Sequence, residues 1–305
     1  MLNRDLTSIL DLSPDELGRI LDVAIAMKRD GGGAVLHGQT LALLFEKPSL
    51  RTRVSFEMAM RRLGGSALYL AGHEVQMGER EPVRDVARVL SRMVECIAVR
   101  TSEQARVTEL AEWADVPVIN ALSEQEHPCQ ALADLLTLRE RFGQLRGLRL
   151  AYVGEGNNVA RSLAFACVMA GVDFVCASPE GYELSADDLA SAAELPGGGS
   201  VTQVNDAAAA VHGANAVYTD VWASMGFEAE LESRVEAFQP YQLNAELLAA
   251  APPDALVMHD LPAHRGQEIT DEVIESDRSV VFDQSENRMH AQQAVLSLIL
   301  GGSPT

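Results

Sequence analysis

The sequence predicts an α/β protein with two domains, in each of which helices flank a parallel sheet. Its 305 residues are enough for about two domains of ~150 residues each. The composition is 47% hydrophobic but only 5% aromatic, so small aliphatic side chains are available to pack helices onto a sheet. Apolar runs of strand length alternate with helical patterns along the chain, which is typical of parallel strands joined by crossover helices.

The first predicted domain opens with a helix. The stretch SPDE at 13–16 is a capping box with proline at the first helical position, and it predicts a helix that ends at the glycines of 31–33. The elements expected next are strand 40–46, helix 50–63, strand 67–70, helix 82–93, strand 96–100, helix 103–114, strand 116–121 and helix 128–143.

The alternation restarts after the polar stretch RERFGQLRG near 140–147, which predicts a domain boundary between residues 145 and 146. The elements expected after it are strand 148–154, helix 158–170, strand 173–178, helix 185–194, strand 201–204, helix 206–212, strands 215–222, 255–261 and 279–284, and a last helix 286–300. Because ligands of parallel sheets bind beyond the carboxyl ends of the strands, functional residues are expected there.

The acidic composition limits the kinds of partner. A formal net charge of −20 and a pI near 4.7 argue against nonspecific binding to nucleic acid or to anionic membranes. No apolar run approaches the ~20 residues of a membrane-spanning helix, and the N-terminus does not resemble a signal peptide. The four cysteines lack zinc-site spacing, so we expect reduced thiols in a cytoplasmic protein.

A cluster of cations stands out against this background, in the stretch FEKPSLRTRVSFE at 45–57. Ser49, Arg51 and Thr52 lie where a strand passes into a helix, and the free N–H groups and dipole of a helix start favour an anion. Hydroxyl groups add donors, and the guanidinium offers a planar fork to phosphate oxygens. The alternative is a solvated basic first turn, which would oppose the helix dipole. The pattern therefore favours an anion site, with Lys47 as its least certain member.

Other strand ends and helix starts carry polar residues of the same kind. Arg100 ends a buried strand, where it is either a surface residue or an anion ligand, and Arg288 begins the last helix. His127 directly precedes a helix that starts with proline, and Gln130 lies in its first turn. A histidine beside an anion site can polarise a carbonyl oxygen, although His127 could instead cap the helix.

Three stretches in the second half are weaker signals. VGEGNN at 153–158 resembles the start of a dinucleotide-binding fingerprint, but Val159 replaces its third glycine, so a dehydrogenase is disfavoured. Asn157 and Asn158 could instead bind the carboxylate or amine of a substrate. Asp220 ends a strand before a short loop in which Met225 either covers a ligand or is simply buried. His259, Asp260 and His264 suggest a metal site, but no further ligand has a diagnostic spacing. We expect neither a metal nor a cofactor.

Taken together and in this order, these stretches resemble the aspartate/ornithine carbamoyltransferase family over nearly the whole chain. The matching stretches are FEKPSLRTRVSFE, GEREPVRDVARVLSR, HPCQALADLLTL, VGEGNN, YTDVWASMG, LPAHRG and FDQSENR. The loop DVWASMG is similar to the ornithine branch of the family and not to the aspartate branch.

The resemblance implies a fold and a reaction. The last helix would return to the first domain, so that 1–145 with 286–305 bind carbamoyl phosphate and 146–285 bind ornithine. The carbamoyl group would pass to the δ-amine of L-ornithine and give L-citrulline and phosphate, a step of arginine biosynthesis. Members of the family are homotrimers with active sites between subunits.

The resemblance also implies roles for individual residues. Arg100 and His127, with Thr52, would polarise the carbonyl oxygen, and Gln130 would bind the amino group. The carbamoyl-phosphate residues would be Ser49, Leu50, Arg51, Thr52, Gln76 from a neighbouring subunit, Arg100, His127, Gln130 and Arg288. The ornithine residues would be Asn158, Asp220, Ser224 and Met225.

Two positions depart from the family pattern. Leu50 replaces a threonine, and its backbone N–H could still serve the phosphate. Asp260 replaces a cysteine of the ornithine branch, and its carboxylate could act catalytically by accepting the amine proton, or could hold the amine charged. Two alternatives therefore stay open: a carbamoyltransferase for another amine such as putrescine, and a non-catalytic homologue that only binds carbamoyl phosphate.

Overall fold

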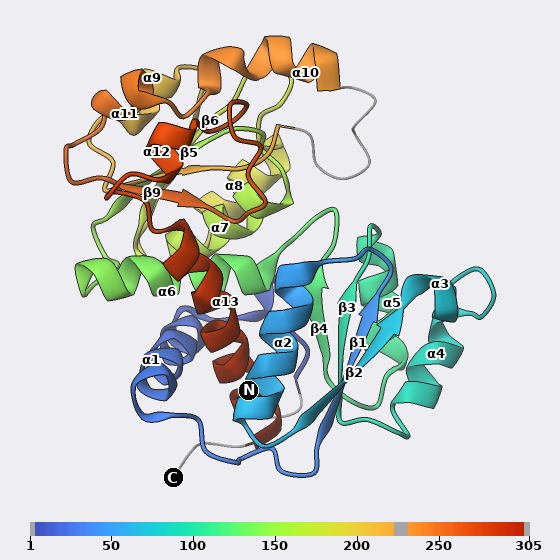
Figure 1. The fold of residues 1–305 in the computed structure, drawn as a ribbon. Helices are drawn as coiled ribbons and strands as arrows, with labels where there is room; N and C mark the ends of the chain where they lie inside the picture. The colour runs from blue at the N-terminus through green and yellow to red at the C-terminus, as the bar shows by residue number, and fades with distance from the viewer. Residues whose placement is uncertain (1–3, 223–230, 302–305) are drawn as a thin grey trace. The chain divides into compact units, whose positions relative to one another are not determined.

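The computed structural model describes residues 4–222 and 231–301, which form two compact units (Figure 1). Met1–Leu136 with Glu286–Thr305 make unit 1, and Thr137–Ser285 make unit 2. Each unit holds one parallel sheet with helices around it, and the chain returns to unit 1 at its C-terminal helix, so the predicted fold class is confirmed. The division falls within a helix and earlier than the boundary predicted at 145–146, which stays a prediction.

Unit 1 contains a four-stranded parallel sheet with the order β2-β1-β3-β4. Its strands are β1 Thr40–Phe45, β2 Ser66–Ala71, β3 Cys96–Arg100 and β4 Val118–Leu122. Its helices are η1 Ile9–Asp11, α1 Pro14–Asp30, α2 Leu50–Arg62, α3 Gly72–Val75, α4 Val83–Leu90, α5 Gln104–Trp113, the first part of α6 Pro128–Phe142 and most of α13 Val281–Leu296. Figure 1 shows α4 and α5 on one side of this sheet and α2 and α13 on the other.

Local signals explain how the first helix forms. The Ser13 hydroxyl accepts a hydrogen bond from the Glu16 N–H at 3.2 Å, and the Glu16 carboxylate accepts one from the Ser13 N–H at 3.0 Å. These two bonds satisfy free donors at the helix start. The helix ends at Gly31, which has φ 85°, a conformation that glycine adopts at little cost. The predicted capping box is therefore confirmed.

Unit 2 contains a five-stranded parallel sheet with the order β7-β6-β5-β8-β9. Its strands are β5 Arg149–Val153, β6 Asp173–Ala177, β7 Val201–Val204, β8 Ala216–Thr219 and β9 Leu256–His259. Its helices include α7 Asn158–Ala170, α8 Ala186–Ala193, α9 Ala207–Val211, α10 Leu231–Phe238, α11 Ala245–Ala249 and α12 Asp271–Ile274. The strand order reverses between β5 and β8, and ligands bind at such a switch point in open parallel sheets.

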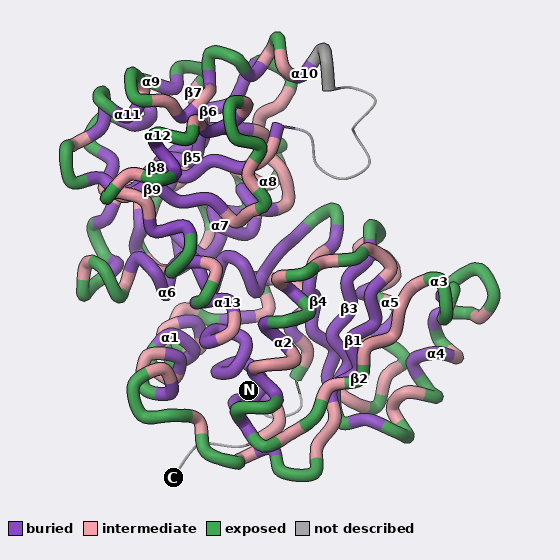
Figure 2. The backbone as a smooth tube through the Cα atoms, in the orientation of Figure 1, coloured by how far each residue is buried: buried purple, intermediate pink, exposed green. Residues whose placement is uncertain are grey.

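The central strands of each sheet are buried, whereas the edge strands β2 and β7 are partly exposed (Figure 2). All residues of β3 are buried, and so are four of the five residues of β5. Such strands give continuous apolar runs, because a parallel sheet is covered on both faces. Among the described residues, no helix is both long enough and apolar enough to span a bilayer.

One predicted strand is wrong. Residues 279–284 were expected to form a strand, but α13 begins at Val281, and only Ser279 pairs with β9, through Val257. The Gln284 N–H donates to the Val280 carbonyl oxygen at 2.8 Å, as in a helix. The last helix thus begins five residues before the predicted start at 286. An apolar run of three residues does not distinguish a strand from a helix start.

Candidate active site

The N-terminus of α2 lies at the carboxyl end of β1, where the anion site was predicted. The Ser49 hydroxyl caps the helix by accepting a hydrogen bond from the Thr52 N–H at 3.3 Å. The Leu50 side chain is 75% exposed, so its contribution to a ligand would come from its backbone. Arg53 is engaged elsewhere, since it pairs with Glu57 and lies over the ring of Tyr69.

Three donors converge on the buried hydroxyl of Thr52. Arg288 on α13 donates from Nη2 to Thr52 Oγ1 at 2.6 Å, Arg100 at the end of β3 donates from Nη1 at 3.4 Å, and the Ser49 hydroxyl donates at 3.0 Å. Arg100 and Arg288 are both buried. A hydroxyl oxygen has two lone pairs, and donors from three different side chains are directed at this one. An anion rich in oxygen would satisfy this arrangement.

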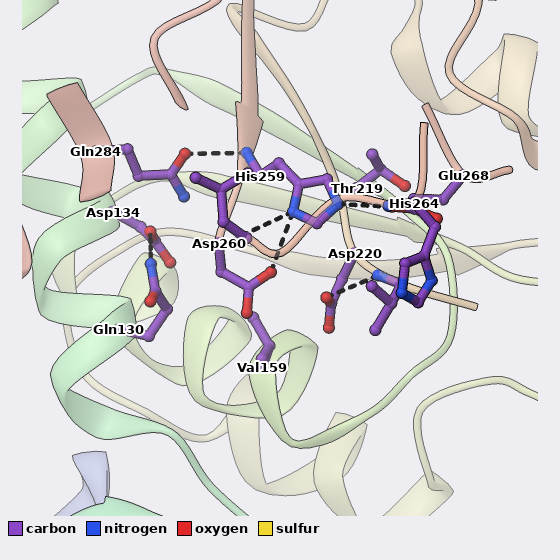
Figure 3. A network of polar contacts seen from close by, with 12 residues as sticks. Gln130, Asp134, Val159, Thr219, Asp220, His259, Asp260, His264, Glu268 and Gln284 are labelled. Atoms are coloured by element: carbon purple, nitrogen blue, oxygen red, sulfur yellow. Dashed lines mark hydrogen bonds and ion pairs between the residues drawn. The ribbon is translucent and has the colours of Figure 1, made fainter. Parts of the chain in front are cut away.

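Asp134 fixes the orientation of the Gln130 side-chain amide, so that its carbonyl oxygen can face a ligand. Its Nε2 donates to the Asp134 carboxylate at 2.8 Å (Figure 3). An ionised carboxylate only accepts hydrogen bonds, so the amide nitrogen must face Asp134. The Gln130 Oε1 atom is buried and has no hydrogen-bond partner among the described residues. It is therefore available to an N–H donor such as an amide nitrogen of a ligand. His127 is buried at the start of the same helix.

Gln76 is not part of the group around Thr52. It ends α3 in the left-handed conformation, with φ 50°, and it is exposed. An exposed side chain at this position is accessible to a second chain.

Unit 2 brings polar side chains together at the ends of β5, β8 and β9. Asn157 caps α7, because its Oδ1 accepts hydrogen bonds from the Val159 and Ala160 N–H groups. Its Nδ2 donates to the Asp220 carboxylate at 2.8 Å. The Tyr152 hydroxyl donates to Asn157 Oδ1 at 3.2 Å, and burial raises the pKa of Tyr152 well above its ordinary value. Asp220 therefore has a fixed direction at the end of β8.

Asp220 and Asp260 form a carboxylate pair at adjacent strand ends. Burial, and then the charge of Asp260, raise the pKa of Asp220 well above its ordinary value. Two carboxyl groups this close favour one bound proton between them. Asp220 is 6% exposed. An ammonium group could replace that proton as the positive charge between them.

His259 lies between acidic partners (Figure 3). Its Nε2 is 3.1 Å from the buried carboxylate of Glu268. Its Nδ1 accepts from the Leu261 N–H at 2.9 Å in the neutral ring, or donates to Asp260 at 3.3 Å when protonated. Burial alone would lower the pKa of His259, but the hydrogen bonds with Asp260 and Glu268 raise it to about 9.

The ligand atoms of Asp220, His259 and Asp260 lie within 4.8 Å of one another, so a metal ion must be considered. In the neutral ring the Nδ1 lone pair is used by Leu261, and in the charged ring both nitrogens carry protons. In neither state is a lone pair directed at the carboxylates. These residues do not fit a metal centre, and the expected absence of a metal stays a prediction.

Two residues of this arrangement, Glu268 and Gln284, were missed in the sequence, and Asn157 was expected only as a possible substrate ligand. Asn157, Glu268 and Gln284 hold Asp220 and His259 in place. Asn157 had a local signal as a helix cap, but no spacing connects Glu268 or Gln284 with β9. The predicted ligands Ser224 and Met225 lie outside the described residues.

The fold and these two groups define a two-domain α/β enzyme class that handles an oxygen-rich anion on one domain and an amine on the other. Comparison with known proteins gives the family. Residues 4–140 match the carbamoyl-P binding domain of the aspartate/ornithine carbamoyltransferases, and residues 146–299 match their Asp/Orn binding domain. The chain belongs to the aspartate/ornithine carbamoyltransferase family.

Individual relatives are similar over nearly their full length. The ornithine carbamoyltransferase of Gloeobacter violaceus is 51% identical over 300 residues, which cover 98% of this chain and 96% of that protein. The anabolic enzyme of Pyrococcus furiosus is 49% identical over 308 residues, with 99% and 98% covered. The solved structure of the Pyrococcus furiosus ornithine carbamoyltransferase has a TM-score of 0.95, with 49% identity and 99% of both chains covered. That of Thermus thermophilus has a TM-score of 0.90, with 48% identity and 98% and 100% covered.

Proposed function

We propose that the protein transfers the carbamoyl group of carbamoyl phosphate to the δ-amine of L-ornithine, giving L-citrulline and phosphate. The observation that carries this proposal is the convergence of two buried arginines and Ser49 on Thr52, in a chain about half identical to proteins named ornithine carbamoyltransferase. The domain of residues 1–145 with 286–305 binds carbamoyl phosphate, and that of residues 146–285 binds ornithine.

The phosphate is held at the start of α2. Ser49, Arg51 and Thr52, with the backbone N–H of Leu50, surround it, because a helix N-terminus favours a dianion. Arg288 also reaches carbamoyl phosphate, and Gln76 enters from a neighbouring subunit. Arg100, His127 and Thr52 polarise the carbonyl oxygen. Gln130 accepts from the amino group, which is supported by the direction of its free Oε1.

Ornithine binds at the strand ends of unit 2. Asn158, Asp220, Ser224 and Met225 hold its amino-acid end. Asp260 is a catalytic residue that accepts the proton of the δ-ammonium. The pair of carboxyl groups at 220 and 260 supports this role, because one of them can take up a proton while the other stays ionised.

The chemistry follows from these positions. The neutral δ-amine attacks the carbonyl carbon, and the oxygen becomes an oxyanion that nearby donors stabilise. The bond from this carbon to the phosphate oxygen then breaks, phosphate leaves with the bonding electrons, and it takes up the proton that the attacking nitrogen loses. Holding both reactants in one orientation contributes several kcal/mol, up to roughly 7–11, to lowering the barrier.

The assembly is a homotrimer in the cytoplasm, and the reaction serves arginine biosynthesis. Several large apolar side chains of unit 1 are exposed, which supports contact with another subunit. They are Leu50, Val54, Leu68, Val89 and Met93. All four cysteines are free and buried, as in a reducing compartment. The biosynthetic direction is supported by the name of the Pyrococcus furiosus relative.

A second candidate function rests on Asp260. The extra carboxylate next to Asp220 makes this end of the site more acidic than a cysteine would, which favours a diamine such as putrescine over an amino acid with its own carboxylate. The intact stretch from Asp220 to Gly226 favours ornithine.

The test is the release of phosphate with formation of the ureido product from carbamoyl phosphate, which is citrulline for L-ornithine, with L-ornithine, putrescine and N-acetylornithine compared from pH 6 to pH 10. We expect selective turnover of L-ornithine. Turnover of putrescine alone would refute the first candidate and support the second, a carbamoyltransferase for a diamine. Binding of carbamoyl phosphate without turnover of any amine would leave only the non-catalytic homologue.

A further inference from the structure

Arg234 on α10 is a buried cation that the proposed reaction does not use. It is 4% exposed, whereas arginine is rarely buried without a partner. Its Nη1 lies 2.8 Å from Glu155 Oε2 and donates to the Trp222 carbonyl oxygen at 3.0 Å. Its guanidinium carbon lies 5.1 Å from the centre of the Tyr182 ring. One side chain thus joins segments that are distant in the sequence.

The two segments that it joins carry the expected ornithine residues of unit 2. Glu155 lies in the turn between β5 and α7, two residues before Asn157 and three before Asn158. Trp222 follows the end of β8, two residues after Asp220. The Asn157–Asp220 hydrogen bond connects the same two segments nearer the strand ends. A shift of either segment would therefore change the spacing of the groups that recognise an amino acid.

The turn at Glu155 has little freedom of its own. The Gly156 N–H donates to the Tyr182 carbonyl oxygen at 2.8 Å, and a Cβ at position 156 would lie 2.2 Å from the Leu184 nitrogen. The turn is thus pressed against residues 182–184. A displacement at Glu155 has to pass on to Asn157, which caps α7.

The segment at Trp222 is held by the same helix in two ways. The indole of Trp222 stacks on Phe238 of α10, with ring centres 6.2 Å apart and planes at 28°. The carbonyl oxygen of Trp222 accepts from Arg234, which also belongs to α10. Trp222 is 2% exposed. Apolar packing would keep the indole in place without Arg234, whereas Arg234 links this segment to the β5–α7 turn through its ion pair with Glu155.

We propose that Arg234, paired with Glu155, is a positioning residue for the amino-acid substrate. It sets the distance between Asn158 at the start of α7 and Asp220 directly after β8, and it does not itself touch the substrate. This inference rests on the proposed function in one respect, the assignment of Asn158 and Asp220 to ornithine.

The test compares Arg234→Met with a matched control, Arg278→Met. Arg278 is also a part-buried arginine of unit 2 that holds loop carbonyl oxygens, those of Pro252 and Ala255. Ala255 directly precedes β9, so this contact lies at the amino-terminal ends of the strands, whereas Asp220 follows the carboxyl end of β8. Arg278 donates to three backbone carbonyl oxygens and is less buried than Arg234, so its variant controls for the loss of a guanidinium that holds loop carbonyl groups.

For Arg234→Met we expect the KM for ornithine to rise about ten- to hundredfold, since a misplacement of ~1 Å near reacting groups has effects of this size. The KM for carbamoyl phosphate should change less than about twofold, because its residues belong to unit 1. Arg278→Met should lower thermal stability and leave both KM values unchanged. Arg234→Lys should recover part of the ornithine affinity, since an ammonium can pair with Glu155 but lacks the planar fork.

Equal KM values for ornithine in the two methionine variants would overturn the inference, and so would a parallel rise for both substrates in Arg234→Met. A readout without catalysis separates this result from a failure of the proposed function. In NMR spectra the side-chain amide signals of Asn157 and Asn158 should shift in Arg234→Met and not in Arg278→Met. If the parent protein turns over no ornithine, unshifted amide signals would still refute the positioning role, and shifted ones would support it for another substrate.

Discussion

Asp220 and Asp260 follow two neighbouring strands, and their carboxyl groups share one environment with the imidazole of His259. The geometry makes the protonation state of this group its central property. Burial disfavours the second negative charge on the pair, while His259 becomes charged at the same pH because acidic partners surround it. The net charge around the amine therefore depends on the protonation states of Asp220, His259 and Asp260.

The first prediction concerns the Asp260→Cys variant. A carboxylate near the δ-amine of ornithine stabilises its charged, unreactive form and raises its pKa. We expect the native protein to have a more alkaline optimum of kcat/KM for ornithine than the variant. The measurement is the pH–rate profile of both proteins at saturating carbamoyl phosphate. Coinciding profiles would show that Asp260 does not act on the amine.

The second prediction concerns stability and the His259–Glu268 contact. The pKa of His259 is raised in the folded protein from 6.5 to about 9. Its stabilising effect is therefore fully present below about pH 6.5 and is lost as the pH rises through about 9. We expect Glu268→Gln to lower the free energy of unfolding by on the order of 1–2 kcal/mol at pH 6, and by less at pH 10.

Gln284→Leu is the control for this measurement. The Gln284 Oε1 atom accepts from the His259 N–H at 2.9 Å, so the variant removes an uncharged hydrogen bond next to the same residue. Its destabilisation should stay constant over the pH range in urea unfolding. A constant difference for Glu268→Gln as well would contradict an imidazolium at position 259.

Helix starts are the elements that carry most of the site. Ser49 caps the N-terminus of α2, Gln130 lies in the first turn of α6, and Asn157 caps α7. Each of these helices follows the carboxyl end of a strand. The parallel topology therefore gathers these polar groups at the carboxyl ends of the strands of each sheet.

The third prediction separates the capping role of Ser49 from its binding role. Ser49→Ala should cost about 1 kcal/mol of stability, as is usual for loss of an N-cap hydroxyl, and should raise the KM for carbamoyl phosphate. Ser13→Ala removes the equivalent cap of α1 and should cost about the same stability with no change in KM. An unchanged KM in Ser49→Ala would restrict this residue to capping.

Helices whose ends carry capping residues could be predicted from the sequence. Elements that depend on contacts between distant residues could not. The capping box at Ser13 and the glycine at 31 correctly bounded α1. The apolar start of α13 was taken for a strand, because only its packing in the folded chain tells the two apart. In the site, the cations of α2 were evident in the sequence. The direction of the Gln130 amide, and the contacts of Glu268 and Arg234, depend on partners that no spacing reveals.

At the scale of the whole molecule, the proposed trimer explains features that one chain leaves open. Gln76 is exposed at the end of α3, away from the donors that meet at Thr52. Large apolar side chains such as Leu68 and Met93 are exposed on unit 1, at 48% and 72%. A neighbouring subunit would cover such surfaces and would receive Gln76 in its own active site.

The last prediction tests this shared site. Gln76→Ala and Arg100→Ala should each abolish most citrulline formation, because each removes a ligand of carbamoyl phosphate. When the two variants are unfolded, mixed in equal amounts and refolded, about a quarter of the sites in random mixed trimers would combine an intact Arg100 with an intact Gln76 from the neighbour. The mixture should therefore regain about a quarter of the native activity, and sedimentation should give a mass of about three times 32.9 kDa. If both variants are inactive and their mixture is inactive too, Gln76 and Arg100 serve the site of the same chain. If the Gln76 variant alone keeps its activity, Gln76 has no part in the reaction.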